Sequence, residues 1–232
     1  DLAYEVFKYL RNSVFPIIIG GDHSISIGSV SGTKMAFPDK RLGVIWIDAH
    51  ADLHTPWTTP SGNVHGMPLA LLMQIEKKGK NNPLVYTMDI WDRLRKIGVN
   101  GPKMQPSDLV IIALRDYEPE ERAIIEEHGI KVITVAELRK VGAKAVVQET
   151  LAHLTLCDKI HVSFDVDCLD PSISIGTGTP VPDGLMANEA SELLQGFCKD
   201  PKTVTLDVVE INPALGQAND MAEATLGILE PL

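Results

Sequence analysis

Trp46-Ile47-Asp48-Ala49-His50-Ala51-Asp52 is the stretch around which this chain is organised. It continues an apolar run that begins at Gly43, which predicts a buried strand, and a Thr/Pro-rich loop follows it. Because side chains alternate along a strand, Asp48, His50 and Asp52 point the same way as the strand ends. Burying such groups without partners would cost several kcal/mol for each charge. A bound cation would remove that cost.

Similar apolar runs alternate with helical patterns along the rest of the chain. Strands are expected at residues 15–19, 43–47, 109–113, 131–134, 159–164 and 203–209. The clearest helical patterns cover residues 24–35, 119–128, 143–154 and 187–197. This alternation predicts right-handed βαβ units, and therefore an α/β fold with a mostly parallel sheet and helices on both faces. In such sheets, ligands bind beyond the carboxyl ends of the strands.

The composition narrows the class of protein. A chain of 232 residues that is 44% hydrophobic fits one α/β domain better than two small ones. Its net charge of −10 argues against a nucleic-acid partner, and no apolar run approaches a membrane span. Three widely spaced cysteines without a CxxC pair favour a reducing compartment, and we expect the cytoplasm. Residues 1–10 have the pattern of a helix already under way, so we expect that an N-terminal segment is lacking.

Polar residues follow two other predicted strands in the same way. Gly20-Gly21-Asp22-His23-Ser24 follows the first run and holds His23 at the mouth of the strand. Asp165 and Asp167 follow the run at 159–164 and share one face by the period of two. A single Asp after a strand is more often a turn or cap residue, but the full set at one topological place favours a metal site. Three strand ends thus offer six candidate ligands, namely His23, Asp48, His50, Asp52, Asp165 and Asp167.

The chemistry of these ligands selects a class of metal. The set is rich in oxygen, with two imidazoles and no thiolate, which favours Mn²⁺ over structural zinc and leaves Fe²⁺, Co²⁺ or Ni²⁺ open. Four carboxylates would balance the charge of two divalent ions. A pair of ions of this kind lowers the pKa of a shared water and produces a hydroxide nucleophile near neutral pH.

GGDHS at 20–24, DAHAD at 48–52 and SFDVDCLDP at 163–171 resemble, in that order, the three signature blocks of the ureohydrolase family of arginases, agmatinases and their relatives. The resemblance implies a three-layer α/β/α fold in a single domain, two Mn²⁺ ions per subunit, and assembly as a homotrimer or homohexamer. It implies hydrolysis of a guanidinium group to urea and an amine. One ion would lie among His23, Asp48, Asp52 and Asp165, and the other among Asp48, His50, Asp52 and Asp167, with Asp48 and Asp52 bridging.

Other segments resemble the substrate-binding parts of arginases in particular. The stretch SGNVHG at 61–66 implies that Ser61 and Asn63 bind the α-carboxylate of the substrate and that His65 acts as a proton shuttle. Glu210 matches the glutamate that grips the guanidinium, a planar cation best held by a bidentate carboxylate. Thr179 matches another position on the substrate side. Loop residues that bond their own backbone are the alternative for Ser61 and Asn63.

Two positions depart from the arginase pattern. Glu118 and Glu121 match residues that bind the α-amino group, but Glu118 stands where an aspartate is usual. Glutamates in the first turn of a helix are also favoured by the helix dipole alone. His54 stands where arginases usually carry Asn, at a position that helps to hold the substrate carboxylate. This change leaves room for a different guanidino substrate.

The resemblance and the residues together predict a binuclear manganese hydrolase. A metal-bridging hydroxide would attack the guanidinium carbon of L-arginine, and the amine would leave with a proton relayed through Asp52, giving L-ornithine and urea. Agmatine or a guanidino acid is the alternative substrate, and a non-catalytic relative is the alternative class. The remaining histidines, His128, His153 and His161, are expected to be structural.

Overall fold

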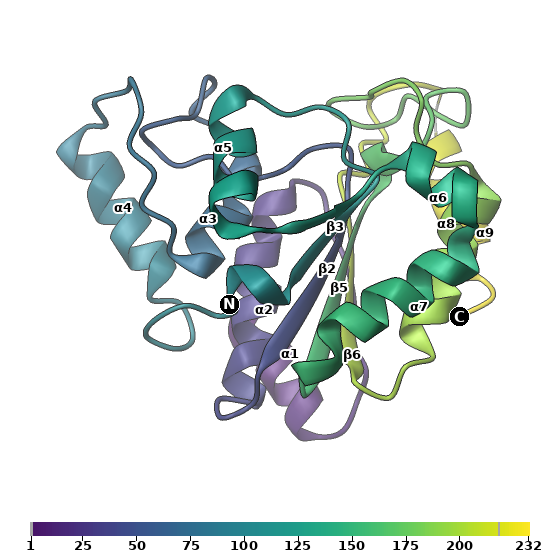
Figure 1. The fold of residues 1–232 in the computed structure, drawn as a ribbon, viewed down its shortest axis with the longest axis horizontal. Helices are drawn as coiled ribbons and strands as arrows, with labels where there is room; N and C mark the ends of the chain where they lie inside the picture. Colours follow the sequence, from purple (N-terminus) through teal and green to yellow (C-terminus); the bar gives the residue numbers. More distant parts are fainter. Residues whose placement is uncertain (1, 218) are drawn as a thin grey trace.

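The computed structural model describes residues 2–217 and 219–232. Its centre is one sheet of six strands in the order β1-β6-β5-β2-β3-β4, in which every neighbouring pair is parallel (Figure 1). The prediction of a mostly parallel sheet is therefore confirmed. The strands are β1 (Ile17–Ile19), β2 (Leu42–Ile47), β3 (Leu109–Ile112), β4 (Lys131–Ile133), β5 (Lys159–Asp165) and β6 (Thr203–Val209).

Helices cover both faces of this sheet, which confirms the three-layer α/β/α fold (Figure 1). One face packs against α2 to α5 and the other against α6 to α9, while α1 lies beside α2. Within the described residues, none of these helices has the length and apolar character that a bilayer crossing requires. The helices are α1 (Leu2–Arg11), α2 (Ser26–Ala36), α3 (Pro68–Met73), α4 (Val85–Arg95), α5 (Pro119–His128), α6 (Val135–Val141), α7 (Ala143–His153), α8 (Ala187–Cys198) and α9 (Asp220–Leu229).

Strand β2 lies between the two cores and contributes to both. Ile45 and Ile47 pack under α6 to α9, whereas Val44 and Trp46 pack against the helices of the other face. All six residues of β2 are buried. A strand covered on both faces needs apolar side chains at every position, which is why its sequence is a continuous apolar run rather than an alternating one.

The register of the strands brings the ends of β2 and β5 to the same level. Ile47 pairs with Phe164, so Asp48 and Asp165 leave two neighbouring strands side by side. Ile19 at the end of β1 pairs with Val208 on β6, which places His23 and Glu210 at the same carboxyl edge. The sheet therefore gathers the segments after β1, β2, β5 and β6 at the edge where ligands bind in parallel sheets.

A buried polar cluster lies deeper in the sheet, around Asp207 of β6. Asp207 Oδ2 accepts a hydrogen bond of 2.9 Å from Ser26 Oγ and another from Ser29, and His161 Nε2 lies 3.0 Å away. Burial by itself raises the pKa of this carboxyl, but His161 and the two serine hydroxyls hold it below its usual value. His161 thus holds a core carboxylate, which is the structural role expected of it.

Replacing Asp207 by Ala should destabilise the protein strongly. The change leaves two serine hydroxyls and His161 buried without their shared acceptor, and we expect the free energy of unfolding to fall by about 3–5 kcal/mol. Urea denaturation followed by circular dichroism measures the loss. Asp89→Ala removes an exposed carboxylate on α4 and is the control, for which we expect less than about 0.5 kcal/mol. Equal losses in the two variants would contradict this account.

Candidate metal centre and substrate cavity

The six predicted metal ligands meet at the carboxyl edge of the sheet. His23 begins a 3₁₀ turn after β1 that is capped by the Asp22 side chain, which accepts a hydrogen bond from Ser24 N. The others follow β2 or stand at the end of β5. Five of the six are buried, and His50 is partly exposed to a cavity. They are His23, Asp48, His50, Asp52, Asp165 and Asp167.

Backbone and indole donors hold the carboxylates of this group in place. Asp48 Oδ1 accepts a hydrogen bond of 2.7 Å from His50 N, and Asp48 Oδ2 accepts one of 2.9 Å from Trp46 Nε1. Asp165 Oδ1 accepts one of 2.8 Å from Asp167 N, at the start of the next 3₁₀ turn. In both pairs the oxygen of one ligand fixes the backbone of the next. The i, i+2 spacing seen in the sequence is therefore also a hydrogen-bond spacing.

Three carboxylates converge on one ring nitrogen of His23. Nδ1 lies 2.9 Å from Asp165 Oδ2, 3.1 Å from Asp48 Oδ2 and 3.2 Å from Asp52 Oδ2. A ring nitrogen carries at most one proton and can satisfy only one of these oxygens. Among the described residues, neither His23 Nδ1 nor Asp52 Oδ2 has a hydrogen-bond partner. Buried groups arranged in this way fit a divalent cation, which all of them could bind together.

A second group of ligands shares Asp48 with the first. His50 Nδ1 lies 2.9 Å from Asp167 Oδ2 and 3.5 Å from Asp48 Oδ1. Asp48 therefore directs one oxygen toward each histidine. Two sets of possible ligands result, His23–Asp48–Asp165 and Asp48–His50–Asp167, with one carboxylate in common. A shared carboxylate is the feature that a two-ion centre needs.

Burial and crowding raise the pKa values of Asp52, Asp165 and Asp167, whereas His23 and His50 lower the pKa of Asp48. Burial, together with the nearby Asp167 and Asp48, raises the pKa of Asp165 well above its usual range. Burial and the charge of Asp48 raise the pKa of Asp52 to about 7. Carboxyls with raised pKa values release their protons when a cation takes the place of those protons. The cluster can therefore exchange its bound protons for metal ions.

Ser163 and Trp46 fix the orientation of the His23 ring. His23 Nε2 lies 2.9 Å from Ser163 Oγ, and the ring stacks on Trp46 with centroids 4.0 Å apart and planes at 5°. A hydrogen-bond partner at one ring nitrogen of a ligand histidine leaves the other ring nitrogen free to bind a metal ion. We did not predict Ser163 from the sequence. Its position two residues before Asp165 on β5 places it on the same face, and this parity was the available signal.

A cavity of about 280 Å³ opens above the predicted ligands. A larger groove of about 1120 Å³, lined by parts of α5 and α6, contains none of the predicted site residues. Size alone therefore does not identify the site, whereas the residues do. The smaller cavity is lined by every residue that was predicted to face the substrate, namely His54, Ser61, Asn63, His65, Glu118, Glu121, Thr179 and Glu210.

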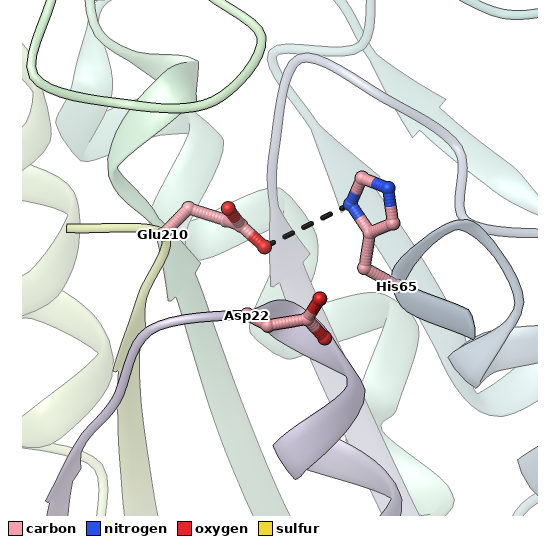
Figure 2. Close-up of side chains that lie close together, drawn as sticks. All are labelled: Asp22, His65 and Glu210. Carbon is pink, nitrogen blue, oxygen red and sulfur yellow. Dashed lines mark ion pairs between the residues drawn. The ribbon is translucent and has the colours of Figure 1, made fainter. Parts of the chain in front are cut away.

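Glu210 and His65 line this cavity, and Asp22 forms a cluster with them (Figure 2). Glu210 has a left-handed backbone, with φ +63°, and its Oε1 accepts a hydrogen bond of 2.6 Å from His23 N. His65 Nδ1 lies 3.8 Å from the same oxygen. Burial raises the pKa of Glu210 above its usual value. The sequence motif contained Asp22, but its place beside Glu210 became visible only in the fold.

Two further contacts join the loops around the cavity. Thr179 Oγ1 donates a hydrogen bond of 3.2 Å to Asp167 Oδ2, so this residue contacts a predicted ligand. Arg115 donates hydrogen bonds of 2.9 Å to Asp167 O and 2.8 Å to Val181 O. Arg115 thereby connects the segment after β3 with the loop that carries Thr179. We did not assign Arg115 a role from the sequence, because its partners are main-chain oxygens far away along the chain.

His54 also lines the cavity, and its ring lies close to two glutamates. His54 Nε2 is 2.9 Å from Glu118 Oε2 and 3.5 Å from Glu121 Oε2. Glu121 is buried, and its carboxyl accepts hydrogen bonds from Leu53 N and Glu118 N. Burial raises the pKa of Glu121 to about 9. Glu121 therefore closes the first turn of α5, and Glu118 is the more exposed of the two.

Comparisons with known proteins agree with this geometry. A family model described as the arginase family matches residues 1–231. The chain is 39% identical to an arginase of Bacillus subtilis (strain 168), over 100% of this chain and 73% of that protein. It is 40% identical to arginase-1 of Homo sapiens, over 97% of this chain and 67% of that protein.

Solved structures give the same result for the fold. A crystal structure of an arginase from Bacillus subtilis matches with a TM-score of 0.87 and 38% identity, over 99% of this chain and 74% of that chain. An arginase from Bacillus cereus matches with a TM-score of 0.86 and 34% identity, over 98% of this chain and 74% of that chain. The predicted resemblance, the arginase-like fold and the enzyme class are all confirmed. The chain belongs to the arginase family, whose members are hydrolases of carbon–nitrogen bonds in linear amidines.

Proposed function

We propose that this protein hydrolyses L-arginine to L-ornithine and urea at a centre of two divalent ions, which we expect to be Mn²⁺. The observation that carries the proposal is Asp48, which directs one carboxylate oxygen to each of two histidine–carboxylate sets. The arginase names of the relatives support the substrate. The cavity above the two sets is lined by the residues that the resemblance assigns to that substrate.

The donor sets suggest which residues hold each ion. His23, Asp48, Asp52 and Asp165 would hold one, and Asp48, His50 and Asp167 the other, with Asp52 as a second shared ligand by the family resemblance. Divalent ions bound there would lower the pKa of a shared water, so that hydroxide is available near neutral pH. The protein contributes rigid placement, because backbone donors fix Asp48 and Asp165, and Ser163 fixes His23.

Glu210 is suited to orient the guanidinium group. Its carboxylate is fixed by the hydrogen bond from His23 N, and therefore stands at a constant place beside the predicted ligands. A guanidinium presents two parallel N–H donors that match a carboxylate. This binding would keep the guanidinium carbon close to the ligand cluster. Holding reacting groups together in this way can account for a large part of the decrease in the activation free energy.

We assign the proton transfers of this reaction to two residues. His65 lies at the mouth of the cavity, where it is partly exposed and 3.8 Å from Glu210. An imidazole there can exchange protons between solvent and the departing amine. Asp52 Oδ2 faces the ligand cluster without a hydrogen-bond partner among the described residues, and is the proposed relay of a proton to the leaving nitrogen.

The proposal also covers the cellular compartment, the class of ligand and the assembly of the enzyme. All three cysteines are free, as they would be in a reducing cytoplasm. The net charge of −10 suits a small cationic substrate better than a nucleic acid. Assembly as a homotrimer or homohexamer follows from the family resemblance alone.

A urea-release assay with three guanidines tests the proposed substrate. We expect the Mn²⁺-loaded protein to prefer L-arginine over agmatine and 4-guanidinobutyrate by at least about tenfold in kcat/KM, because each lost contact with a charged group costs about 1.5–3 kcal/mol. A preference for agmatine or 4-guanidinobutyrate would assign another ureohydrolase activity. Release of urea from none of the three would indicate a relative without turnover.

Metal content tests the shared role of Asp48. After loading with Mn²⁺ and removal of free metal, elemental analysis should find about two ions per chain in the wild type. His50→Asn should retain about one ion, and Asp48→Asn should lose most of both, because Asp48 directs one oxygen to each set. Asp116→Asn removes an exposed carboxylate 3.8 Å from His50 Nε2 and should retain both ions. Full metal content in Asp48→Asn would refute the shared site.

Glu210→Gln tests the guanidinium contact separately from the metal. The amide keeps an oxygen for His23 N but loses the charge, so kcat/KM for L-arginine should fall by about a hundredfold, as expected for two charge-assisted hydrogen bonds. Metal content should not change. Asp22→Asn alters the exposed carboxylate of the same cluster and should change kcat/KM by less than about fivefold. A similar loss in both variants would show that general negative charge, not Glu210, binds the substrate.

A further inference from the structure

His54 has both of its ring nitrogens engaged within the protein. Nε2 lies 2.9 Å from Glu118 Oε2, and Nδ1 lies 3.1 Å from Thr58 Oγ1. His54 is also buried, and its main-chain N donates a hydrogen bond of 3.0 Å to Gly66 O. The ring is therefore held from the main chain and from both nitrogens. A side chain so constrained has little freedom to turn toward a ligand in the cavity.

The partners of His54 also determine where its proton lies. An ionised carboxylate only accepts hydrogen bonds, so Nε2 carries the hydrogen that points at Glu118. Thr58 Oγ1 already accepts a hydrogen bond of 2.8 Å from Thr55 N and can donate its own hydrogen to Nδ1. In this arrangement the one N–H of a neutral imidazole is directed at Glu118. The ring then has no N–H left for the carboxylate of a substrate.

The contact with His54 fixes the carboxylate of Glu118. Its side chain is about half exposed, 49%, at the start of α5, and it lines the cavity. Contact with Glu121 and the hydrogen bond from His54 lower the pKa of Glu118, whereas burial raises the pKa of Glu121 to about 9. At neutral pH the pair of glutamates therefore presents one negative charge to the cavity, and it lies on Glu118.

We propose that His54 is a positioning residue for Glu118, which the resemblance to arginases matches with a residue that binds the α-amino group of the substrate. His54 holds one oxygen of Glu118 and directs the carboxylate at the cavity. It does not bind the substrate carboxylate, which is left to the loop of Ser61 and Asn63. This inference rests on the proposed function, and it names which part of the substrate His54 serves.

His54 and Glu118, the two departures from the arginase pattern, then depend on each other. Glu118 has one more rotatable bond than the aspartate usual there, so an unsupported carboxylate would spread over more rotamers. His54 is longer and more rigid than the usual Asn and reaches that carboxylate. Each substitution compensates for the other. Changing one alone should therefore be worse than changing both.

A double-mutant cycle with three substrates tests this pairing. L-Arginine carries both the ammonium and the carboxylate, agmatine only the ammonium, and 4-guanidinobutyrate only the carboxylate. In His54→Asn we expect KM for L-arginine and agmatine to rise about tenfold, and KM for 4-guanidinobutyrate to change less than about twofold. In the double variant with Glu118→Asp, KM for L-arginine should return to within about threefold of the wild type.

Two more variants separate positioning from mere loss of structure. His54→Gln retains an N–H donor that can reach Glu118, and should keep KM for L-arginine within about threefold of the wild type. His128→Asn changes an exposed histidine at the end of α5 and is the matched control. If His54→Asn weakens L-arginine and 4-guanidinobutyrate but spares agmatine, then His54 is a carboxylate contact and the proposal is overturned. Additive effects in the double variant would also overturn it.

Equilibrium binding gives a readout that does not depend on turnover. Calorimetry with the Mn²⁺-loaded protein can compare L-ornithine, putrescine and 5-aminopentanoate, which differ in the same two groups as the substrates. His54→Asn should raise Kd for the first two about tenfold and leave the third unchanged within about twofold. If the wild type releases no urea yet shows this pattern, the proposed reaction fails and the role of His54 stands. Equal binding of all three by the wild type would overturn the proposal.

Discussion

Mutual repulsion among buried carboxylates is the constraint on which the rest of this structure depends. Asp48, Asp52 and Asp165 are buried, and each has an oxygen within 3.2 Å of a single nitrogen of His23. One proton on that nitrogen cannot compensate three negative charges. Such a group is stable only if it keeps protons of its own or receives cations. The raised pKa values of Asp52 and Asp165 show that these carboxyls tend to keep their protons. Two divalent ions would replace those protons and supply the positive charge instead.

The fold holds the predicted metal ligands in place through contacts at the edge of the sheet and within the core. The register of β2 and β5 sets Asp48 and Asp165 side by side before any ligand is present. Behind them, His23 Nε2 contacts Ser163 Oγ, which lies 3.4 Å from Ser26 Oγ, and Ser26 in turn donates to the buried Asp207. A polar chain therefore runs from the ligand cluster into the core. Its members are buried and hydrogen-bonded, so the position of the His23 ring is coupled to the packing of the sheet.

Local patterns predicted those parts of the molecule that depend on near neighbours in sequence. The six strands follow from apolar runs, and the predicted ligands follow from the strand ends. The strand period of two does not extend to Asp52, because β2 ends at Ile47 and Asp52 has a left-handed backbone, with φ +52°. The helix at Val85–Arg95 was not singled out, because only Trp91 of its side chains is buried and it has little apolar periodicity. The contact of His54 with Glu118 joins residues 64 apart and depends on how the loop after β2 meets the start of α5. Contacts of this kind, like those of Arg115, belong to the tertiary fold and leave no local pattern.

The central claim is that one carboxylate, Asp48, lies between two divalent ions. Anomalous diffraction at the manganese absorption edge, from a crystal of the Mn²⁺-loaded protein, tests it most directly. The account predicts two anomalous peaks about 3.5–4 Å apart, one beside His23 and the other beside His50, with Asp48 between them. A single peak, or peaks that lie away from Asp48, would contradict it.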